Sequence, residues 1–243
     1  MMNKKILVTG GDGKFAQVLK KKNKILNLFF ASKKECNITN IKSIEKIIKK
    51  IKPKIILHTA AISRPMKIHD QNFTKSIEVN IIGTANLVKV CHKYKIKLIY
   101  FSTGYVYAGT KGNYSEEESV KPFNNYAISK LGGECSVAMY KNSLILRITM
   151  TEKPFLFKYA YSNVFANFMF HEDLVNILPK ILNEKGILNI GGKAQSVFNF
   201  AKKNNPKVKK IKLKNKKSLP FNQTMNLIKL NRILKKTKLN QFL

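Results

Sequence analysis

Long apolar runs, cysteine and arginine are all scarce in this chain of 243 residues. No stretch approaches the roughly 18 consecutive apolar residues that suggest a membrane span. The opening segment "MMNKKILVTGGDG" reaches glycine before a signal-peptide core could form. We therefore expect a cytoplasmic protein with no membrane partner. Because 44% of the residues are hydrophobic, the chain can bury one substantial core, or a core and a small lobe.

The few cysteines and acidic residues do not form a pattern that binds metal. The cysteines are scattered, odd in number and without a Cys-x-x-Cys pair: Cys36, Cys91 and Cys135. This indicates neither a disulfide framework nor a zinc site. The segment "HED" at 171–173 contains three possible ligands, but consecutive positions on a helix point in different directions. We expect an acid-rich helix start there, and no metal.

The formal charge of +33 comes almost entirely from lysine, because arginine is scarce. Of the 46 basic residues, three are arginines: Arg64, Arg147 and Arg232. Arginine is the preferred reader of bases and phosphates, so a lysine excess spread along the chain indicates compositional bias and not a nucleic-acid partner. The segment "KKNNPKVKKIKLKNKK" at 202–217 could be a phosphate-attracting patch or a solvated segment.

Short apolar runs alternate with amphipathic ones. Strands are predicted at "KKILVTG", "ILNLFFAS", "KIILHTAA", "KLIYFST", "SLILRIT" and, later, "GILNIGG". Between them, helices are predicted over 13–22, 41–51 and 74–94, with another that ends near residue 140. Strands that are apolar on both faces and separated by helices form parallel sheets covered on both sides. The pattern predicts an α/β fold with a doubly wound parallel sheet.

A glycine-rich turn follows the first predicted strand. Gly10, Gly13 and Ala16 form a G-x-x-G-x-x-A pattern that opens a helix, which continues with Lys14 and Phe15. Small residues let the backbone approach a pyrophosphate, which then lies on the helix N-terminus. The position of this turn between a strand and a helix predicts a dinucleotide site.

The residue type at the end of the second predicted strand indicates whether the dinucleotide is NAD or NADP. An acid at this position holds the ribose 2′-hydroxyl of NAD. The chain has Ser32 there, followed by Lys33 and Lys34, which offer a hydroxyl and two cations to a 2′-phosphate. We expect NADP, with NAD as the alternative.

Tyr126 and Lys130 in "YAISK" lie four positions apart in a predicted helix and so share one face. A phenol that exchanges a proton near neutral pH needs a nearby cation, because its ordinary pKa is about 10. In a lysine-rich chain the spacing alone could be accidental. Its meaning depends on the surrounding motifs.

Those motifs resemble the extended short-chain dehydrogenase/reductase family, and within it the branch that contains dTDP-4-dehydrorhamnose reductase. The resemblance covers residues 4–150 and rests on motifs in the family's order: "TGGDGKFA", "CNITN", "HTAA", "NIIGTANL", "STGYVY" and "YAISKLGGE". It implies an NADP-dependent reductase of a nucleotide-linked 4-keto-6-deoxy sugar, used in polysaccharide precursor synthesis.

The resemblance also implies roles for individual residues. Tyr126 would be the proton donor, Lys130 would lower its pKa and hold the nicotinamide ribose, and Thr103 would polarise the substrate carbonyl. Ser102 competes with Thr103 for that role. The expected substrate contacts are Ser102, Thr103, Tyr105 and Tyr126. Further cofactor contacts are expected from Asn37, Ile38, Ala60 and Ala61. Asn80 is expected to support the site, and His58 to be a packed histidine.

Two departures from the family put the substrate in doubt. The stretch between Arg147 and Asp173 is shorter than the family's substrate lobe, and Gly104 replaces a common aspartate. We expect residues 1–150 to form the dinucleotide-binding domain, with 170–200 returning to it. Residues 151–169 and 201–243 would form the lobe. Two alternatives remain, an NAD-dependent nucleotide-sugar epimerase or dehydratase and a non-catalytic NADP-binding regulatory subunit. Family analogy suggests a homodimer.

Overall fold

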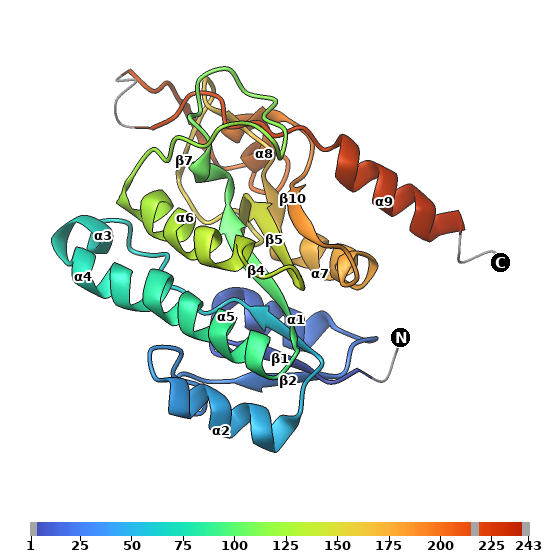
Figure 1. Cartoon of the computed structure of the whole chain (residues 1–243). Helices are drawn as coiled ribbons and strands as arrows, with labels where there is room; N and C mark the ends of the chain where they lie inside the picture. The colour runs from blue at the N-terminus through green and yellow to red at the C-terminus, as the bar shows by residue number, and fades with distance from the viewer. Residues whose placement is uncertain (1–3, 215–218, 240–243) are drawn as a thin grey trace.

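The computed structural model describes residues 4–214 and 219–239, and its centre is a parallel sheet (Figure 1). Its six strands lie in the order β10-β5-β4-β3-β1-β2, and every neighbouring pair is parallel. Their bounds are β1 Ile6–Thr9, β2 Leu28–Ala31, β3 Ile55–His58, β4 Lys97–Thr103, β5 Ser143–Ile148 and β10 Gly186–Ile190. The predicted doubly wound α/β fold is confirmed.

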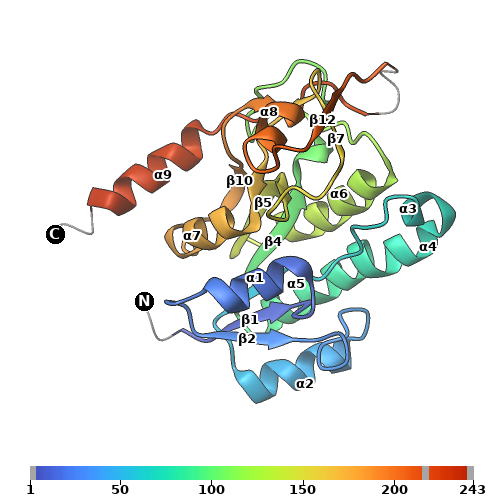
Figure 2. The ribbon, with the colours of Figure 1, turned by 180° about the vertical axis from the view of Figure 1, so that it is seen from behind.

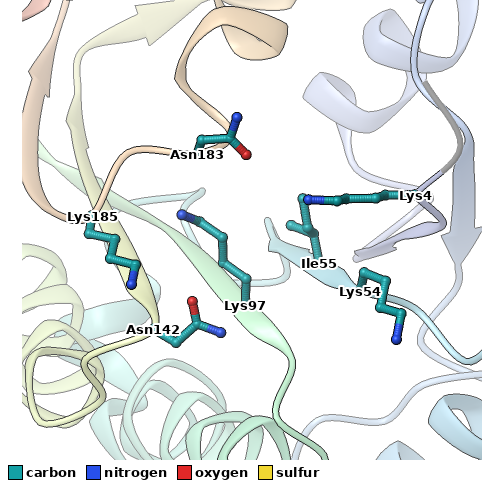
Figure 3. Close-up of a pocket in the computed structure, with 7 residues that line it drawn as sticks. All are labelled: Lys4, Lys54, Ile55, Lys97, Asn142, Asn183 and Lys185. Atoms are coloured by element: carbon teal, nitrogen blue, oxygen red, sulfur yellow. The ribbon is translucent and has the colours of Figure 1, made fainter. Parts of the chain in front are cut away.

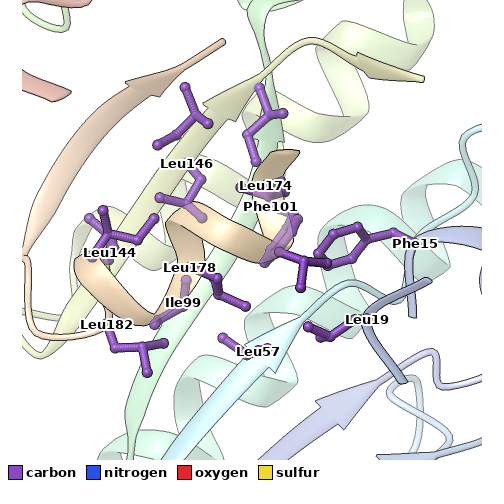
Figure 4. Packing of buried hydrophobic residues seen from close by; sticks show 14 of the residues in the cluster. Phe15, Leu19, Leu57, Ile99, Phe101, Leu144, Leu146, Leu174, Leu178 and Leu182 are labelled. Atoms are coloured by element: carbon purple, nitrogen blue, oxygen red, sulfur yellow. The ribbon is translucent and has the colours of Figure 1, made fainter. Parts of the chain in front are cut away.

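Helices cover both faces of this sheet (Figures 1 and 2). One face packs against α1 (Lys14–Lys22) and α7 (His171–Ile181), and its core includes Phe15, Phe101 and Leu174 (Figure 4). The other face packs against α2 (Ile41–Ile51), α5 (Gly83–Lys93) and α6 (Asn125–Ala138). Alternate residues of each strand serve the two cores, which is why the strands read as continuous apolar runs.

The helix predicted over 74–94 contains a π-helical turn. The segment consists of α4 (Phe73–Ser76), the π-helical turn Ile77–Ile82 and α5. Asn80, within this turn, pairs with both backbone groups of Ile62 at 2.8 and 2.9 Å and donates to the Ser129 hydroxyl at 2.9 Å. It therefore ties the loop after β3 to α6, the helix that carries Tyr126 and Lys130. The supporting position predicted for Asn80 agrees with these contacts.

Gly133 lets α6 approach the π-helical turn closely. A Cβ at this position would lie 2.6 Å from both the Asn80 carbonyl oxygen and the Tyr100 hydroxyl. Because these atoms are buried and one belongs to the backbone, Gly133→Ala is expected to lower the free energy of unfolding by about 2 kcal/mol. Urea denaturation measures the change. The exposed Cys135→Ala on the same helix is the control, and an equal change in both variants would contradict the tight contact.

A small lobe stands over the carboxyl ends of the strands (Figure 1). Its core includes Phe155, Phe170 and Phe200. Its short elements are β6 Met150–Thr151, β7 Tyr159–Tyr161, β8 Phe165–Ala166, β9 Met169–Phe170, β11 Gln195–Ser196, α8 Val197–Lys202 and β12 Lys209–Ile211. The segment predicted to return over 170–200 supplies α7 and β10 to the main body, but its end, β11, pairs with β8 in the lobe.

The C-terminal helix α9 (Ile228–Leu239) lies beside the main body and not in the lobe (Figure 2). Its Leu230 is buried in the same core as α1 and α7, and Ile233 and Leu234 pack against that core. The apolar positions of α9 therefore extend the core that α1 and α7 form on one face of the sheet.

No helix in the described ranges is long and apolar enough to span a bilayer. The basic segment at 202–217 contributes β12, which pairs in parallel with β7, while its residues 215–217 lie outside the described ranges. Within the described residues, no group of three or more His, Cys, Asp or Glu side chains could hold a metal ion.

Candidate active site

A tight turn after β1 shapes the first part of the site. Gly10 has a φ of +68°, which residues with side chains rarely adopt, and a Cβ there would lie 2.8 Å from the Ala60 Cα. Gly13 donates its N–H to the Gly10 carbonyl at 2.9 Å and caps α1 without a side chain. Ala60 and Ala61 follow β3 after Thr59. The first N–H groups of α1 thus open onto a small-residue surface, an arrangement that fits a dinucleotide diphosphate.

A carboxylate occupies the end of β2, where the sequence suggested only a hydroxyl and cations. Glu35 accepts hydrogen bonds at 2.9 Å from both the backbone N–H and the hydroxyl of Ser32. These bonds hold the pKa of Glu35 below its ordinary value, so it is ionised at neutral pH. Lys33 and Lys34 are exposed beside it. The Ser-x-x-Glu spacing, which is typical of reciprocal capping, was the signal in the sequence for this contact.

The Glu35 carboxylate is expected to weaken discrimination in favour of a 2′-phosphate. Glu35→Gln removes a negative charge beside Ser32 and should raise the preference for NADP over NAD about tenfold, equivalent to about 1.4 kcal/mol. Fluorescence titration with both reduced cofactors measures this ratio. Glu78→Gln, an exposed change on the π-helical turn, is the control. A ratio that stays constant in Glu35→Gln would show that Glu35 does not face the ribose.

Three charged side chains meet next to the glycine turn. The Glu152 carboxylate lies 2.5 Å from the Lys14 ammonium and 3.0 Å from the Arg64 guanidinium. Burial raises the pKa of Glu152, but hydrogen bonds and the two cations outweigh it and lower the pKa to about 2. Lys14 begins α1, Arg64 follows β3 and Glu152 follows β6. A carboxylate thus holds two cations beside the expected position of a diphosphate. Neither Arg64 nor Glu152 was predicted as a site residue from the sequence.

Glu152 is expected to compete with a bound diphosphate for the two cations. Glu152→Gln should tighten NADPH binding about fivefold, because exposed ion pairs are worth up to about 1 kcal/mol. Fluorescence titration at low salt measures the affinity. Glu45→Gln, which removes a carboxylate paired with Lys93 on other helices, is the control. Weaker binding in Glu152→Gln would show instead that this carboxylate organises the site.

Three predicted cofactor residues have their side chains engaged within the protein. Phe15 is buried in the core, so only its backbone can contact a ligand. The Asn37 amide oxygen accepts from the backbone N–H and hydroxyl of Thr39 at 3.2 and 2.9 Å. These two bonds use both of its lone pairs, so contact with an adenine amine requires Thr39 to release one. The Ile38 side chain is buried, and this residue supports the edge of the site through packing.

The predicted catalytic tyrosine and threonine lie together at the carboxyl end of β4. The Thr103 side chain lies beside the Tyr126 phenol and lowers its pKa, and the Tyr105 ring lies edge-on to Tyr126 at 6.5 Å. Burial is the main cause that raises the pKa of Tyr126 to about 12, and Tyr105 adds to it, while Thr103 and Arg64 lower it. Tyr126 is therefore protonated at neutral pH.

His69 packs against the other side of this phenol. Its ring centroid lies 5.1 Å from that of Tyr126, and its Nδ1 is 2.7 Å from the Ser76 hydroxyl. Burial lowers the pKa of His69, so the ring is neutral near pH 7. His69 thus helps fix the orientation of Tyr126. No recognisable motif marks it in the sequence.

Lys130 shares the helix face with Tyr126, as predicted, but its ammonium contacts a different ring. Nζ lies 4.1 Å from the centroid of Tyr100, whose hydroxyl donates to the Lys130 carbonyl at 2.9 Å. Burial lowers the pKa of Lys130 to about 7, and Glu134 opposes this shift. In this arrangement the cation that lowers the pKa of Tyr126 is Arg64 and not Lys130.

Ser102 belongs to a buried polar network behind the site. Its hydroxyl donates to Glu134 at 2.7 Å, and the same carboxylate pairs with Arg147. Arg147 also donates to the Tyr107 hydroxyl at 2.8 Å, which in turn donates to Asn189 at 2.9 Å. Since the Ser102 hydroxyl is engaged in this network, Thr103 is the hydroxyl at the strand end that contacts Tyr126. Arg147 therefore serves to pair with a buried carboxylate.

Two further residues have structural explanations. His58 is buried between the hydroxyls of Thr9 and Thr84, each 3.0 Å from one ring nitrogen, as expected of a packed histidine. Burial and then the Lys130 charge hold its pKa well below the ordinary value. A Cβ at Gly104 would lie 2.8 Å from the Thr149 hydroxyl, so the aspartate common in the resembled family does not fit here.

Residues 4–173 match the RmlD substrate binding domain family, a match that covers more than half of the chain. The chain belongs to this family. The fold agrees, since the dTDP-4-dehydrorhamnose reductase of Bacillus anthracis, whose structure contains NADP, superposes with a TM-score of 0.84. That structure is 22% identical and the superposition covers 95% of this chain and 93% of the other.

Curated relatives resemble 60% of the chain. Methionine adenosyltransferase 2 subunit beta of Xenopus laevis is 30% identical over 156 residues, which is 60% of this chain and 46% of the relative. The dTDP-4-dehydrorhamnose reductase of Aggregatibacter actinomycetemcomitans is 28% identical over 155 residues, or 60% and 51%. The chain spans about half the length of the curated relatives it matches.

Proposed function

We propose that this protein is an NADP-dependent reductase of a nucleotide-linked 4-keto-6-deoxy sugar. The observation that carries the proposal is the meeting of Thr103 and Tyr126 at the carboxyl end of β4. Lys130 lies one helical turn further along α6, and its charge helps to lower the pKa of His58, which bonds to Thr9 of β1, the strand that leads into the glycine turn. The proton donor and the glycine turn that would hold the cofactor thus both lie at the carboxyl ends of the strands, where ligands of parallel α/β folds bind. The reductases among the similar proteins support the same activity.

The residues have complementary tasks in this reaction. A bound nicotinamide supplies a hydride to the ketone carbon. Tyr126 donates its proton to the ketone oxygen, and its pKa of about 12 ensures that the proton is present at neutral pH. The Thr103 hydroxyl holds and polarises the carbonyl. Lys130 holds the ribose hydroxyls, and its charge lowers the pKa of Tyr126 when the ammonium leaves the Tyr100 ring.

A second candidate function is a binding subunit without catalysis. The observation that favours it is the position of Lys130, whose ammonium rests on the Tyr100 ring and has a pKa of about 7. A tyrosine with a pKa of about 12 and no charged lysine beside it is a poor acid. Methionine adenosyltransferase 2 subunit beta is a similar protein whose name describes a subunit.

NADPH oxidation in the presence of a panel of nucleotide-linked 4-keto sugars separates the two functions. We expect absorbance at 340 nm to fall with dTDP-4-keto-6-deoxy sugars, and Thr103→Val to slow the reaction about 100-fold because it removes the hydroxyl that polarises the carbonyl. Thr149→Val is the control for loss of a nearby hydroxyl. NADPH binding without oxidation of any sugar would favour the binding subunit, and no NADPH binding would contradict both functions.

A further inference from the structure

A second concave site lies at the N-terminal ends of the parallel strands, opposite the end of the sheet that carries the glycine turn. It is an open hollow with a volume of about 670 Å³, lined by Lys4, Lys54, Ile55, Lys97, Asn142, Asn183 and Lys185. Each of its four lysines comes from the start of a different strand, since they precede or begin β1, β3, β4 and β10. Because the strands are parallel, their N-terminal ends lie together, and these cations, which are far apart in sequence, meet there.

Lys97 lies at the centre of this group in Figure 3, between Lys185 and Lys4. It is only 9% exposed, and its Nζ donates to the Glu184 backbone carbonyl at 2.6 Å. Burial is the main cause that lowers the pKa of Lys97 to about 8; Lys185 and Lys4 contribute to this shift, and the Glu184 carboxylate opposes it. At neutral pH this ammonium is thus still mostly charged, while its hydrogen-bond partner is a neutral carbonyl.

The site has a large excess of positive charge. Among the described residues, none of the four lysines is within ion-pair distance of a carboxylate, including that of Glu184. A buried charge without a counter-ion is costly, and like charges around one hollow repel. A multivalent anion would remove both costs at once. The lysine-rich composition alone does not explain this, because it produces exposed lysines and not a buried one surrounded by others.

We propose that this lysine pocket binds a short oligophosphate chain, either free or as part of a nucleotide. Phosphate oxygens accept hydrogen bonds from several ammonium groups at once, and lysine binds phosphate as a point charge without the planar geometry of arginine. The volume is within the range of small-molecule sites. The pocket lies across the sheet from the glycine turn and is separate from the expected dinucleotide site.

Isothermal titration calorimetry with sodium tripolyphosphate at low salt tests the proposal. The double variant Lys54→Gln/Lys185→Gln removes two exposed pocket lysines and should bind at least tenfold more weakly. The control Lys42→Gln/Lys46→Gln removes the same charge from the exposed face of α2 and should bind within twofold of the unchanged protein. Equal weakening in both variants, or no measurable binding to the unchanged protein, would overturn the proposal.

Two further measurements define the ligand and its location. ATP that binds no more tightly than tripolyphosphate would show that the phosphate chain suffices, whereas tighter ATP binding lost in the pocket variant would assign the site to a nucleotide. Lys97→Met should weaken binding similarly and reduce the proton uptake measured at pH 8, because the bound anion favours the charged lysine. The pocket variants should bind NADPH as the unchanged protein does. If saturating NADPH displaced tripolyphosphate, the anion would occupy the glycine turn and the proposal would be wrong.

Discussion

Tyr126→Phe is expected to lower the turnover of ketone reduction about 1,000-fold, which is within the range that a positioned general acid contributes. The variant removes one oxygen atom and keeps the ring, which packs against His69 and Tyr105. The Thr103 hydroxyl also accepts a hydrogen bond from the Tyr105 backbone N–H at 3.2 Å, and this group cannot replace a phenol as the proton donor. NADPH affinity should change less than twofold, because the cofactor cradle is formed by the glycine turn.

The measurement is NADPH oxidation at saturating cofactor, together with a separate binding titration. Tyr94→Phe is the matched control, since it removes the hydroxyl of a tyrosine at the C-terminal end of α5 that is not among the predicted site residues. If Tyr126→Phe and the unchanged protein reduced the same sugar at equal rates, another group would be the acid. The proposed mechanism would then be wrong even though the fold and cofactor could stand.

Lys130→Met is expected to have opposite effects on activity and stability. Reduction should slow about 100-fold or more, since the variant lacks the cation proposed to assist Tyr126 and hold the ribose. At pH 7 the variant should unfold with a free energy about 3 kcal/mol larger than the unchanged protein, because it no longer buries a charged ammonium. Met has a similar length and packs well against an aromatic ring.

The stability gain should depend on pH in a defined direction. The pKa of Lys130 is about 7 in the folded protein, compared with an ordinary value of 10.5. Between these values the unfolded chain binds more protons than the folded one, so the stability of the unchanged protein rises with pH. The advantage of Lys130→Met should therefore be largest at or below pH 7 and disappear near pH 10.5.

Urea denaturation at pH 7 and pH 10 checks this expectation. Lys42→Met, an exposed position on α2, should change the free energy of unfolding by less than about 0.5 kcal/mol at either pH. If Lys130→Met were less stable than the unchanged protein by the same amount at pH 7 and pH 10, the expectation would be wrong. In that case the contact between the ammonium and the Tyr100 ring would outweigh the cost of burying the charge.

The sequence by itself determined the order of strands and helices and the positions of the main motifs. Apolar runs with helix-length spacers predicted the parallel sheet, and the bounds of α2 agree with the predicted 41–51. The glycine turn was predictable because its residue types are required by local backbone geometry, shown by the positive φ of Gly10. The spacing of Tyr126 and Lys130 likewise depends only on the pitch of a helix.

The tertiary structure alone decided which side chains meet and in which state of charge. Glu152 pairs with Lys14 and Arg64, and His69 packs against Tyr126. The four pocket lysines meet at the N-terminal ends of the strands. The residues of each group are far apart in sequence. It also placed the Lys130 ammonium on Tyr100, which no local spacing specifies. The physical reason is that periodicity reports which face a residue occupies, whereas burial and pKa values depend on atoms that other segments bring to that face.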